Sequence, residues 1–236
     1  MWSGPRNIST ALLRAWGSRT DTFVCDEPLY AHYLLETGAA HPGRDEVIAS
    51  QETDWRKVVE RLVGEIPAGK SIYYQKQMAH HLLPQIDRDW VLGLDNAFLL
   101  RDPREMLVSL TKVTPDPGIR DTGLPQQCEL FDLLRERTGR IPPVVDSRDV
   151  LDAPEPILTR LCAALDVPFE PAMLTWEPGP RETDGVWARH WYASVEASTG
   201  FRRHTPRVEP VPEPLTGVYQ ECARYYDRLY AHRLTA

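Results

Sequence analysis

The sequence lacks the closely spaced cysteines that tie small secreted domains together or hold a zinc ion. Its cysteines are widely separated, and no two of them form a CxxC pair. Disulfide frameworks and zinc sites depend on such pairs. We therefore expect free thiols in a reducing compartment, which predicts a cytoplasmic protein without a disulfide or zinc site. The thiols are those of Cys25, Cys128, Cys162 and Cys222.

Long apolar runs and an excess of positive charge are also missing. No apolar run reaches the roughly 18 residues that a membrane helix needs, and we expect no secretory leader, because the first motif begins at once. The net charge of −7 provides no general attraction to nucleic acid or to anionic membranes. The sequence therefore predicts no nucleic-acid partner and no membrane partner.

The composition is that of an ordinary globular protein. The chain has 236 residues, of which 42% are hydrophobic and 26% are charged. This length suffices for one domain with a substantial core, which we expect to span residues 1–236. Short apolar runs alternate with longer amphipathic segments, a pattern typical of α/β folds. We expect an α/β fold with a mostly parallel sheet flanked by helices.

The order of these segments predicts where ligands bind. We expect strands at 22–25, 71–75, 97–101 and 143–146. We expect helices at 9–18, 28–36, 53–65, 79–86, 103–112, 124–138, 154–166 and 215–232. Glu27, Lys76 and Arg101 each lie just beyond an expected strand, so they should converge on the ligand-binding edge of a parallel sheet. Loops are expected at 37–52 and 113–126, where they could cover an acceptor.

The opening segment, Gly4 to Thr10, has the character of an anion-binding loop. A nucleotide-hydrolysing loop reads GxxxxGK[ST], but here Ser9 replaces the second glycine and Thr10 replaces the lysine. Backbone amides at a helix N-terminus still favour an anion, and Arg6 adds a fork of donors. Alternatively, Ser9 is only the N-cap of the helix, beside an exposed arginine. Few residues precede Gly4, so the strand before this loop is very short or begins upstream.

A second candidate anion site lies in FLLRDPREMLVSL. Arg101 ends an apolar strand, and Ser109 follows eight residues later, about two turns into the expected helix. Asp102 and Pro103 suit the N-cap and first position of that helix. Those capping roles do not account for Arg101, whose burial would be unfavourable without an anion. Arg101 and Ser109 together would form a compact phosphate site.

Both segments together resemble the sulfotransferases that use 3′-phosphoadenosine 5′-phosphosulfate (PAPS), most closely the tyrosylprotein and bacterial branches. The resemblance covers most of the chain and implies a P-loop-type, three-layer fold with a mostly parallel sheet of about five strands flanked by helices. PRNIST stands where that family has PRSGTT or PKSGTT, which implies a 5′-phosphosulfate site made of Pro5, Arg6, Asn7, Ile8, Ser9 and Thr10. Arg101 and Ser109 match the pair that binds the 3′-phosphate. Ile8 replaces a glycine and lacks its access to positive φ, so we expect the loop backbone to differ locally.

The resemblance also implies catalytic roles. Glu27, in FVCDEPLY, matches the acidic base of the tyrosylprotein branch, and the adjacent Asp26 with partial burial would raise its pKa. Alternatively, Asp26 or Glu27 caps the helix at 28–36. Lys76 is implied to contact the sulfuryl group together with Arg6, although it could simply end a strand in solvent.

Two further segments bear on the site. Ser198 and Thr199 resemble a Ser-Thr stretch over the cofactor, in which the serine touches the sulfuryl group. Arg202 and Arg203 follow and could add phosphate contacts. A polar surface loop is the alternative. Met78 stands where the cytosolic branch has its histidine base. One of the two nearby histidines could still line the acceptor pocket, but we expect one to be packed and the other exposed. These histidines are His80 and His81.

The predicted activity is transfer of a sulfuryl group from PAPS to a hydroxyl or amine of a small-molecule acceptor, leaving 3′-phosphoadenosine 5′-phosphate (PAP). No metal is required, because the sulfuryl group carries less charge than a phosphoryl group. A non-catalytic nucleotide-binding protein of the same fold is the alternative, which Ile8 and the short first strand would favour. A P-loop kinase-like enzyme would need the missing lysine. The oligomeric state is open, with a homodimer as one option.

Overall fold

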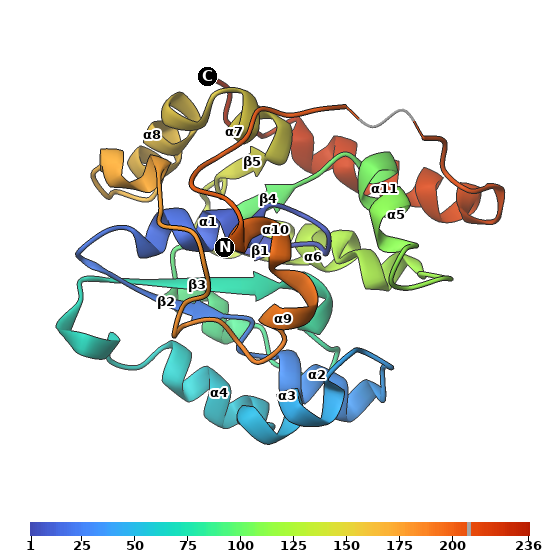
Figure 1. The fold of residues 1–236 in the computed structure, drawn as a ribbon, viewed down its shortest axis with the longest axis horizontal. Helices are drawn as coiled ribbons and strands as arrows, with labels where there is room; N and C mark the ends of the chain where they lie inside the picture. The colour runs from blue at the N-terminus through green and yellow to red at the C-terminus, as the bar shows by residue number, and fades with distance from the viewer. Residues whose placement is uncertain (207–208) are drawn as a thin grey trace.

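The computed structural model describes residues 1–206 and 209–236 and is built around one sheet. All its strand pairs are parallel, and the strand order is β2-β3-β1-β4-β5 (Figure 1). The strands are β1 (Trp2–Ser3), β2 (Thr22–Asp26), β3 (Ile72–Met78), β4 (Phe98–Leu100) and β5 (Val144–Asp146). The expected α/β fold is confirmed, and each of the four strands expected from the sequence exists.

Helices connect the successive strands except β3 and β4, which are joined by a segment with only 3₁₀ turns. They are α1 (Ser9–Gly17), α2 (Tyr30–Thr37), α3 (Arg44–Ser50), α4 (Trp55–Leu62), α5 (Pro103–Leu110), α6 (Leu124–Thr138), α7 (Ser147–Asp152), α8 (Pro154–Ala164), α9 (Ala188–Trp191), α10 (Ala193–Glu196) and α11 (Thr216–Tyr230). Short 3₁₀ turns occur at Pro67–Gly69, Ala79–His81, Asp89–Gly93, Ile119–Thr122, Pro171–Leu174 and Glu213–Leu215. In Figure 1, α2, α3 and α4 lie together beyond β2.

The two faces of the sheet carry two separate cores. Successive side chains of a strand point to opposite faces. Phe98 and Leu100 therefore pack in one core with residues of α5, α6 and α11, whereas Leu99 packs in the other with residues of α1 and α8. In β5, Val144 belongs to the first core and Val145 to the second. The helices thus form a layer on each side of the sheet.

One expected helix is wrong, and one expected loop contains a helix. The segment 79–86 forms only the turn Ala79–His81, after which Leu82 leaves helical geometry at φ −79° and ψ 82°. Pro84 opposes a helix over 79–86, because a proline disfavours the helical region for the preceding residue, Leu83, and cannot donate a helical hydrogen bond itself. The expected loop at 37–52 contains α3, whose one buried residue is Val47. The other seven expected helices are confirmed, α6 with the expected ends and the others with shifted ends.

The short central strand β1 holds the first loop at the carboxyl edge of the sheet. Trp2 pairs with Gln77 of β3 and with Phe98 of β4. Gly4 then passes so close to the Ile119–Thr122 turn that a Cβ there would lie 2.5 Å from the Thr122 carbonyl oxygen. The loop is therefore fixed by close backbone packing, which no larger residue at position 4 would allow.

Two sequence predictions concern the whole chain. All four cysteines are unpaired thiols, as expected. Within residues 1–206 and 209–236, no helix combines the length and the apolar character that crossing a bilayer would require.

Candidate functional site

A cavity of about 660 Å³ lies at the carboxyl edge of the sheet, the usual ligand position in this architecture. Almost all the site residues expected from the sequence line it: Pro5, Arg6, Asn7, Ile8, Ser9, Thr10, Glu27, Lys76, Arg101, Ser109, Ser198 and Arg202. Thr199 does not, because its side chain is exposed and its carbonyl accepts from the Trp176 amide. In the described part of the chain, no group of three or more His, Cys, Asp or Glu residues is placed to hold a metal ion.

The two candidate anion sites meet in one place, which we call the donor site. Arg6 Nε donates to Ser109 Oγ at 3.0 Å, and the Arg101 guanidinium donates to the backbone oxygen of Arg6. Asn7 ties the loop to the sheet through a 3.3 Å bond from Nδ2 to the Leu99 oxygen. Segments about 95 residues apart in sequence are thereby joined at the end of β4.

The N-terminus of α1 opens onto the donor site. Ile8 is the N-cap and makes no side-chain capping bond, so the alternative of a Ser9 N-cap is wrong. Ser9, Thr10 and Ala11 form the first turn and line the cavity. First-turn amides have no partner within a helix and carry partial positive charge. This end of α1 therefore suits an anionic ligand.

A carboxylate that the sequence reading missed stands beside Arg101. Glu105 is buried, and its Oε2 lies 3.3 Å from Arg101 Nη2. Its Oε1 lies 2.9 Å from His204 Nε2. The anion that the buried Arg101 was expected to need is thus supplied in part by the protein itself. The four-residue spacing from Arg101 to Glu105 was the signal that could have revealed it. Asp102 caps α5 as expected, accepting from the Glu105 amide at 3.1 Å.

Lys76 lies at the centre of the cavity wall, inside β3 and not beyond its end as expected. The ladder continues past Lys76 because Gln77 and Met78 pair with β1. Lys76 is 1% exposed, so the alternative of a strand end in solvent is wrong. Its Nζ donates to Asp26 Oδ1 and Glu27 Oε1, each at 2.8 Å. A buried ammonium group is thereby held between two carboxylates.

These contacts set the protonation states of Glu27 and Lys76. Burial raises the pKa of Glu27, the Lys76 ammonium partly offsets this, and Asp26 adds to the rise. Burial opposes the charge on Lys76, but Asp26 and Glu27 together hold the pKa of its amine well above the usual range. Lys76 therefore stays charged at neutral pH, while Glu27 is a stronger base than an exposed glutamate.

Tyr192 completes this group, although sequence reasoning assigned it no role. Its hydroxyl donates to Asp26 Oδ2 at 2.6 Å and lies 2.6 Å from Lys76 Nζ, which donates to it. Trp187 Nε1 donates to the same oxygen at 3.1 Å. The tyrosine lies at the end of α9, in a segment where the sequence shows only several aromatic residues. No spacing motif marked it.

The backbone is strained at two cavity residues. Among the described non-glycine residues with positive φ are Arg6 at 56° and Glu27 at 44°. Such positions cost about 1–3 kcal/mol each and concentrate at functional sites. In the first loop the positive φ lies at Arg6, whereas Ile8 has φ −88°. Helix α2 is capped by Leu29 without a side-chain bond, so the capping alternative for Glu27 is wrong.

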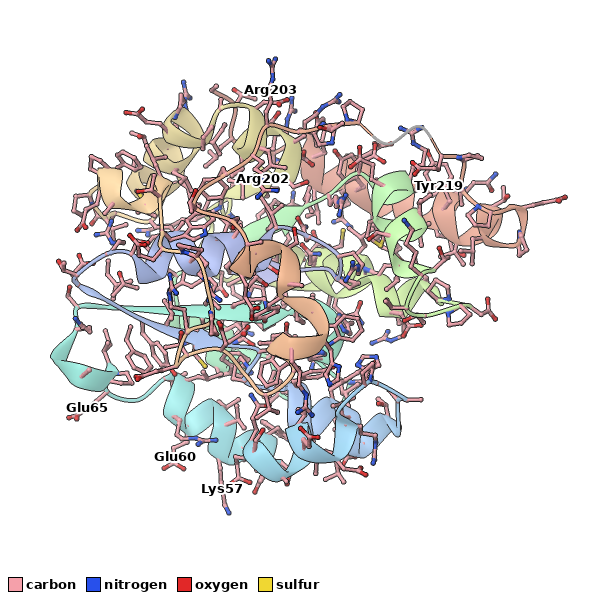
Figure 2. The ribbon with its side chains drawn as sticks, viewed as in Figure 1. Lys57, Glu60, Glu65, Arg202, Arg203 and Tyr219 are labelled. Atoms are coloured by element: carbon pink, nitrogen blue, oxygen red, sulfur yellow. The ribbon has the colours of Figure 1, made fainter. Side chains whose placement is uncertain are left out.

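Four residues of the segment after α10 line the cavity: Ser198, Gly200, Phe201 and Arg202. Ser198 is buried, accepts from Trp176 Nε1 at 3.1 Å and donates to the Val195 oxygen at 2.6 Å. It is therefore not part of a surface loop. Arg202 Nη2 donates to the Ala197 oxygen at 3.3 Å. Figure 2 shows Arg202 over the middle of the molecule, whereas Arg203 points away from it.

Aromatic and imidazole rings line another part of the cavity. The His81 ring stacks on Tyr30 and on Tyr33, with both centroid distances 4.7 Å. His80 meets Tyr33 edge-on at 5.3 Å, and the Tyr30 hydroxyl lies 2.8 Å from His41 Nδ1. The expectation of one exposed histidine is wrong, because α2 packs on the turn that carries both His80 and His81.

Burial keeps these two imidazoles neutral. It lowers the pKa of His80 to about 3 and that of His81 well below the usual value. His41 is partly buried, and this burial also lowers its pKa, although Asp121 acts in the opposite sense. Apart from the Asp121 carboxylate, this part of the wall thus presents rings and neutral polar atoms.

The sequence matches the sulfotransferase domain family over residues 1–220. Two relatives from Arabidopsis thaliana, named branched-chain-amino-acid aminotransferase-like proteins 1 and 2, are 37% and 33% identical over 215 and 233 residues. The alignments cover 91% and 98% of this chain but 38% and 41% of the relatives. The chain therefore spans about two fifths of the length of these curated relatives.

A solved structure agrees with the family match at the level of the fold. The sulfotransferase domain from the curacin biosynthetic pathway aligns with a TM-score of 0.54 at 15% identity. The alignment covers 100% of this chain and 97% of that domain. Together with the family match over nearly its whole length, this shows that the chain belongs to the sulfotransferase domain family.

Proposed function

We propose that this protein transfers a sulfuryl group from PAPS to a hydroxyl or amine of a small-molecule acceptor and releases PAP. Membership of the family supports sulfotransferase activity in general. The donor, the acceptor class and the residue roles are the content of the proposal.

The observation that carries the proposal is the junction of the two anion sites. PAPS presents two anionic groups, the 5′-phosphosulfate and the 3′-phosphate. Loop 5–10 and the uncapped amides of α1 suit the first group. Arg101 and Ser109 suit the second, and their contacts with Arg6 keep both sites in one geometry. Each anionic group of PAPS thereby has a matching set of hydrogen-bond donors in the cavity.

Four side chains and the amides of α1 carry the proposed chemistry. Glu27 accepts the proton of the acceptor hydroxyl or amine as the new bond to sulfur forms. Lys76 and Ser198 face the charge on the sulfuryl oxygens. Arg6 and the α1 amides stabilise the phosphate oxygen that is released when its bond to sulfur breaks. Holding these groups in line accounts for much of the rate, because little covalent chemistry falls to the protein.

The test is a comparison of nucleotides by calorimetry. PAP, 5′-AMP and ATP are titrated into the protein with and without Mg²⁺. We expect PAP to bind most tightly, and without dependence on the metal. Arg203→Ala is the control variant, because that side chain is 90% exposed and should leave all three affinities unchanged. Equal binding of the three nucleotides, or a preference for Mg-ATP, would refute the proposal.

Glu105 favours one alternative, a nucleotide-binding protein that does not catalyse transfer. Its carboxylate shares Arg101 with the proposed 3′-phosphate site and would repel the phosphate. Incubation with ³⁵S-labelled PAPS and a panel of alcohols and amines separates the two. Labelled product supports the enzyme. PAP binding without any labelled product from the panel supports the non-catalytic protein.

A further inference from the structure

The ring-lined part of the cavity contains one carboxylate. We define the acceptor compartment as Tyr33, His41, His80, Asp121 and Trp191, all of which line the cavity. Ring contacts connect these side chains, with Tyr33 6.0 Å from His41 and His41 6.5 Å from Trp191. Asp121 acts electrostatically on Tyr33 and on His41. The carboxylate therefore belongs to the same compartment as the rings.

The compartment adjoins the proposed base. The Glu27 carbonyl accepts from the Tyr30 amide at 3.0 Å, and the Glu27 carboxylate acts electrostatically on the Tyr30 hydroxyl. The Tyr30 hydroxyl in turn bonds to His41. An acceptor held against these rings would therefore lie beside the group that takes its proton.

The charged side chains of the cavity are divided between its two parts. The cationic side chains among the described lining residues are Arg6, Lys76, Arg101 and Arg202. Arg6 and Arg101 belong to the donor site, and Lys76 is held by Asp26 and Glu27. The acceptor compartment has no lysine or arginine, and burial keeps His80 neutral. Asp121 is half-buried and lines the cavity, and its Oδ2 accepts from the Gly118 amide at 2.8 Å, which holds the carboxylate in place at the cavity wall.

Rings beside a carboxylate discriminate between ligand charges. The faces of tyrosine and tryptophan attract a cation, and partial removal of water strengthens that attraction. An anionic group would lose its hydration against the same rings and would be repelled by Asp121. A neutral alcohol would gain contact area only.

We propose that the acceptor compartment selects an alcohol or amine that carries a cationic ammonium group, bound by the rings of Tyr33, His41 and Trp191 and paired with Asp121. This deepens the proposed function and rests on it, because it assumes that the ligand in this compartment is the acceptor. Glu27 would take the proton of the reacting hydroxyl or amine, and Asp121 would hold the ammonium group, which does not react.

Two pairs of ligands, each a cation and a neutral compound of similar shape, test the proposal on the PAP-loaded protein. Choline is compared with 3,3-dimethylbutan-1-ol, and tyramine with 4-ethylphenol, by calorimetry; 3-(4-hydroxyphenyl)propionate is the anionic probe. In at least one pair, we expect the cation to bind about tenfold more tightly than its neutral partner, and the anion to bind most weakly. Equal affinities within both pairs, tighter binding of the anion, or no binding of any probe would overturn the proposal.

A variant tests whether the Asp121 carboxylate causes the preference for the cation. Asp121→Asn keeps an oxygen for the Gly118 amide and removes the charge. It should abolish the preference for the cation while leaving the affinities for the neutral ligand and for PAP unchanged. Asp116→Asn is the matched control in the same loop, because Asp116 is exposed and does not line the cavity. An unchanged cation preference in Asp121→Asn would overturn the assignment.

The experiment also separates this inference from the proposed function. If PAP fails to bind, the proposed donor is wrong, and the charge series is repeated on the protein without nucleotide. A cation preference that Asp121→Asn removes would then keep the compartment as an ammonium site of a protein with another activity. If PAP binds and no cation preference appears, only the acceptor inference is lost.

Discussion

The donor site and the acceptor compartment share one cavity but are built from different interactions. The donor site is held by hydrogen bonds between charged and polar groups, such as Arg6 to Ser109. The acceptor compartment is held by ring packing, as in the stack of Tyr33 on His81. Directed bonds require particular residue types at particular spacings, whereas rings can pack in many arrangements. A motif can therefore mark the first region, but it does not mark the second.

The largest effect is expected at Glu27, where the two regions meet. Glu27→Gln removes the proposed base and keeps the size of the side chain. Turnover should fall by roughly 10²–10⁴-fold, because that is the usual contribution of general base catalysis. PAP affinity should change little, since Glu27 is not assigned to either phosphate. Initial rates with ³⁵S-labelled PAPS and direct PAP binding measure the two quantities.

Glu36→Gln serves as the control for that experiment. Glu36 lies on α2 like the neighbouring rings, but its side chain is exposed and does not line the cavity. It should keep normal turnover and normal binding. Near-normal turnover in Glu27→Gln would show that Glu27 is not the base. Another group of the cavity would then have to accept the proton.

Arg101→Ala should weaken the donor site and leave the acceptor compartment unchanged. Loss of a charge-assisted bond to the 3′-phosphate is expected to weaken PAP binding by about 10–100-fold. Binding of 5′-AMP, which lacks that phosphate, should change much less. Calorimetry with both nucleotides gives the ratio, and the cation preference of the acceptor compartment should persist. Equal weakening of PAP and 5′-AMP would mean that Arg101 does not read the 3′-phosphate.

The fold was largely predictable because the strands are short apolar runs. Phe98–Leu100 and Val144–Asp146 were found in this way. The end of β3 was missed because Lys76 and Gln77 are polar, and a pattern reading places polar residues outside a buried strand. They are 1% and 3% exposed because the ladder with β1 and the Asp26–Lys76 pair compensate their burial.

The candidate site was predictable only in part. Arg6, Arg101 and Ser109 stand at recognisable spacings, so the sequence pointed to a donor site, and the structure brings them together. Tyr192 lies 166 residues from Asp26, and only the folded chain shows that their side chains meet. Asp121 appeared in an expected loop, where a charged residue is unremarkable. Contacts made by tertiary packing leave no local pattern.

Tyr192→Phe should destabilise the buried group around Lys76, where the donor site and the acceptor compartment meet, without removing a charge. The lost hydroxyl leaves Asp26, Lys76 and Trp187 each short of one partner. Leaving buried polar groups unsatisfied should lower the free energy of unfolding by about 1–3 kcal/mol. Urea unfolding measures this. Tyr219→Phe on α11 is the control, because Tyr219 packs against the core formed with α5 and α6 and does not line the cavity. It should change stability much less. Equal stabilities would show that the Tyr192 hydroxyl contributes nothing net.

The smallest effect concerns the neutral imidazoles of the ring-lined wall. Burial lowers the pKa of His80 to about 3, so the folded protein does not take up the proton that the unfolded chain binds below about pH 6.5. The unfolded state then binds more protons, and stability must fall as the pH falls. Between pH 7 and pH 6 this histidine should lower the free energy of unfolding by less than about 1 kcal/mol, approaching about 1.4 kcal/mol per pH unit below that range.

Comparison with a variant isolates this contribution, because other groups titrate in the same range. Asp146, whose pKa burial raises to about 6, acts in the opposite sense. His80→Phe should therefore lose less stability than the unchanged protein when urea unfolding is repeated at pH 7, 6 and 5. His190→Gln, at an exposed position, should follow the unchanged protein. Parallel curves for all three would mean that His80 takes up its proton in the folded state, which would place a positive charge beside Tyr33 and weaken the case for a cationic acceptor.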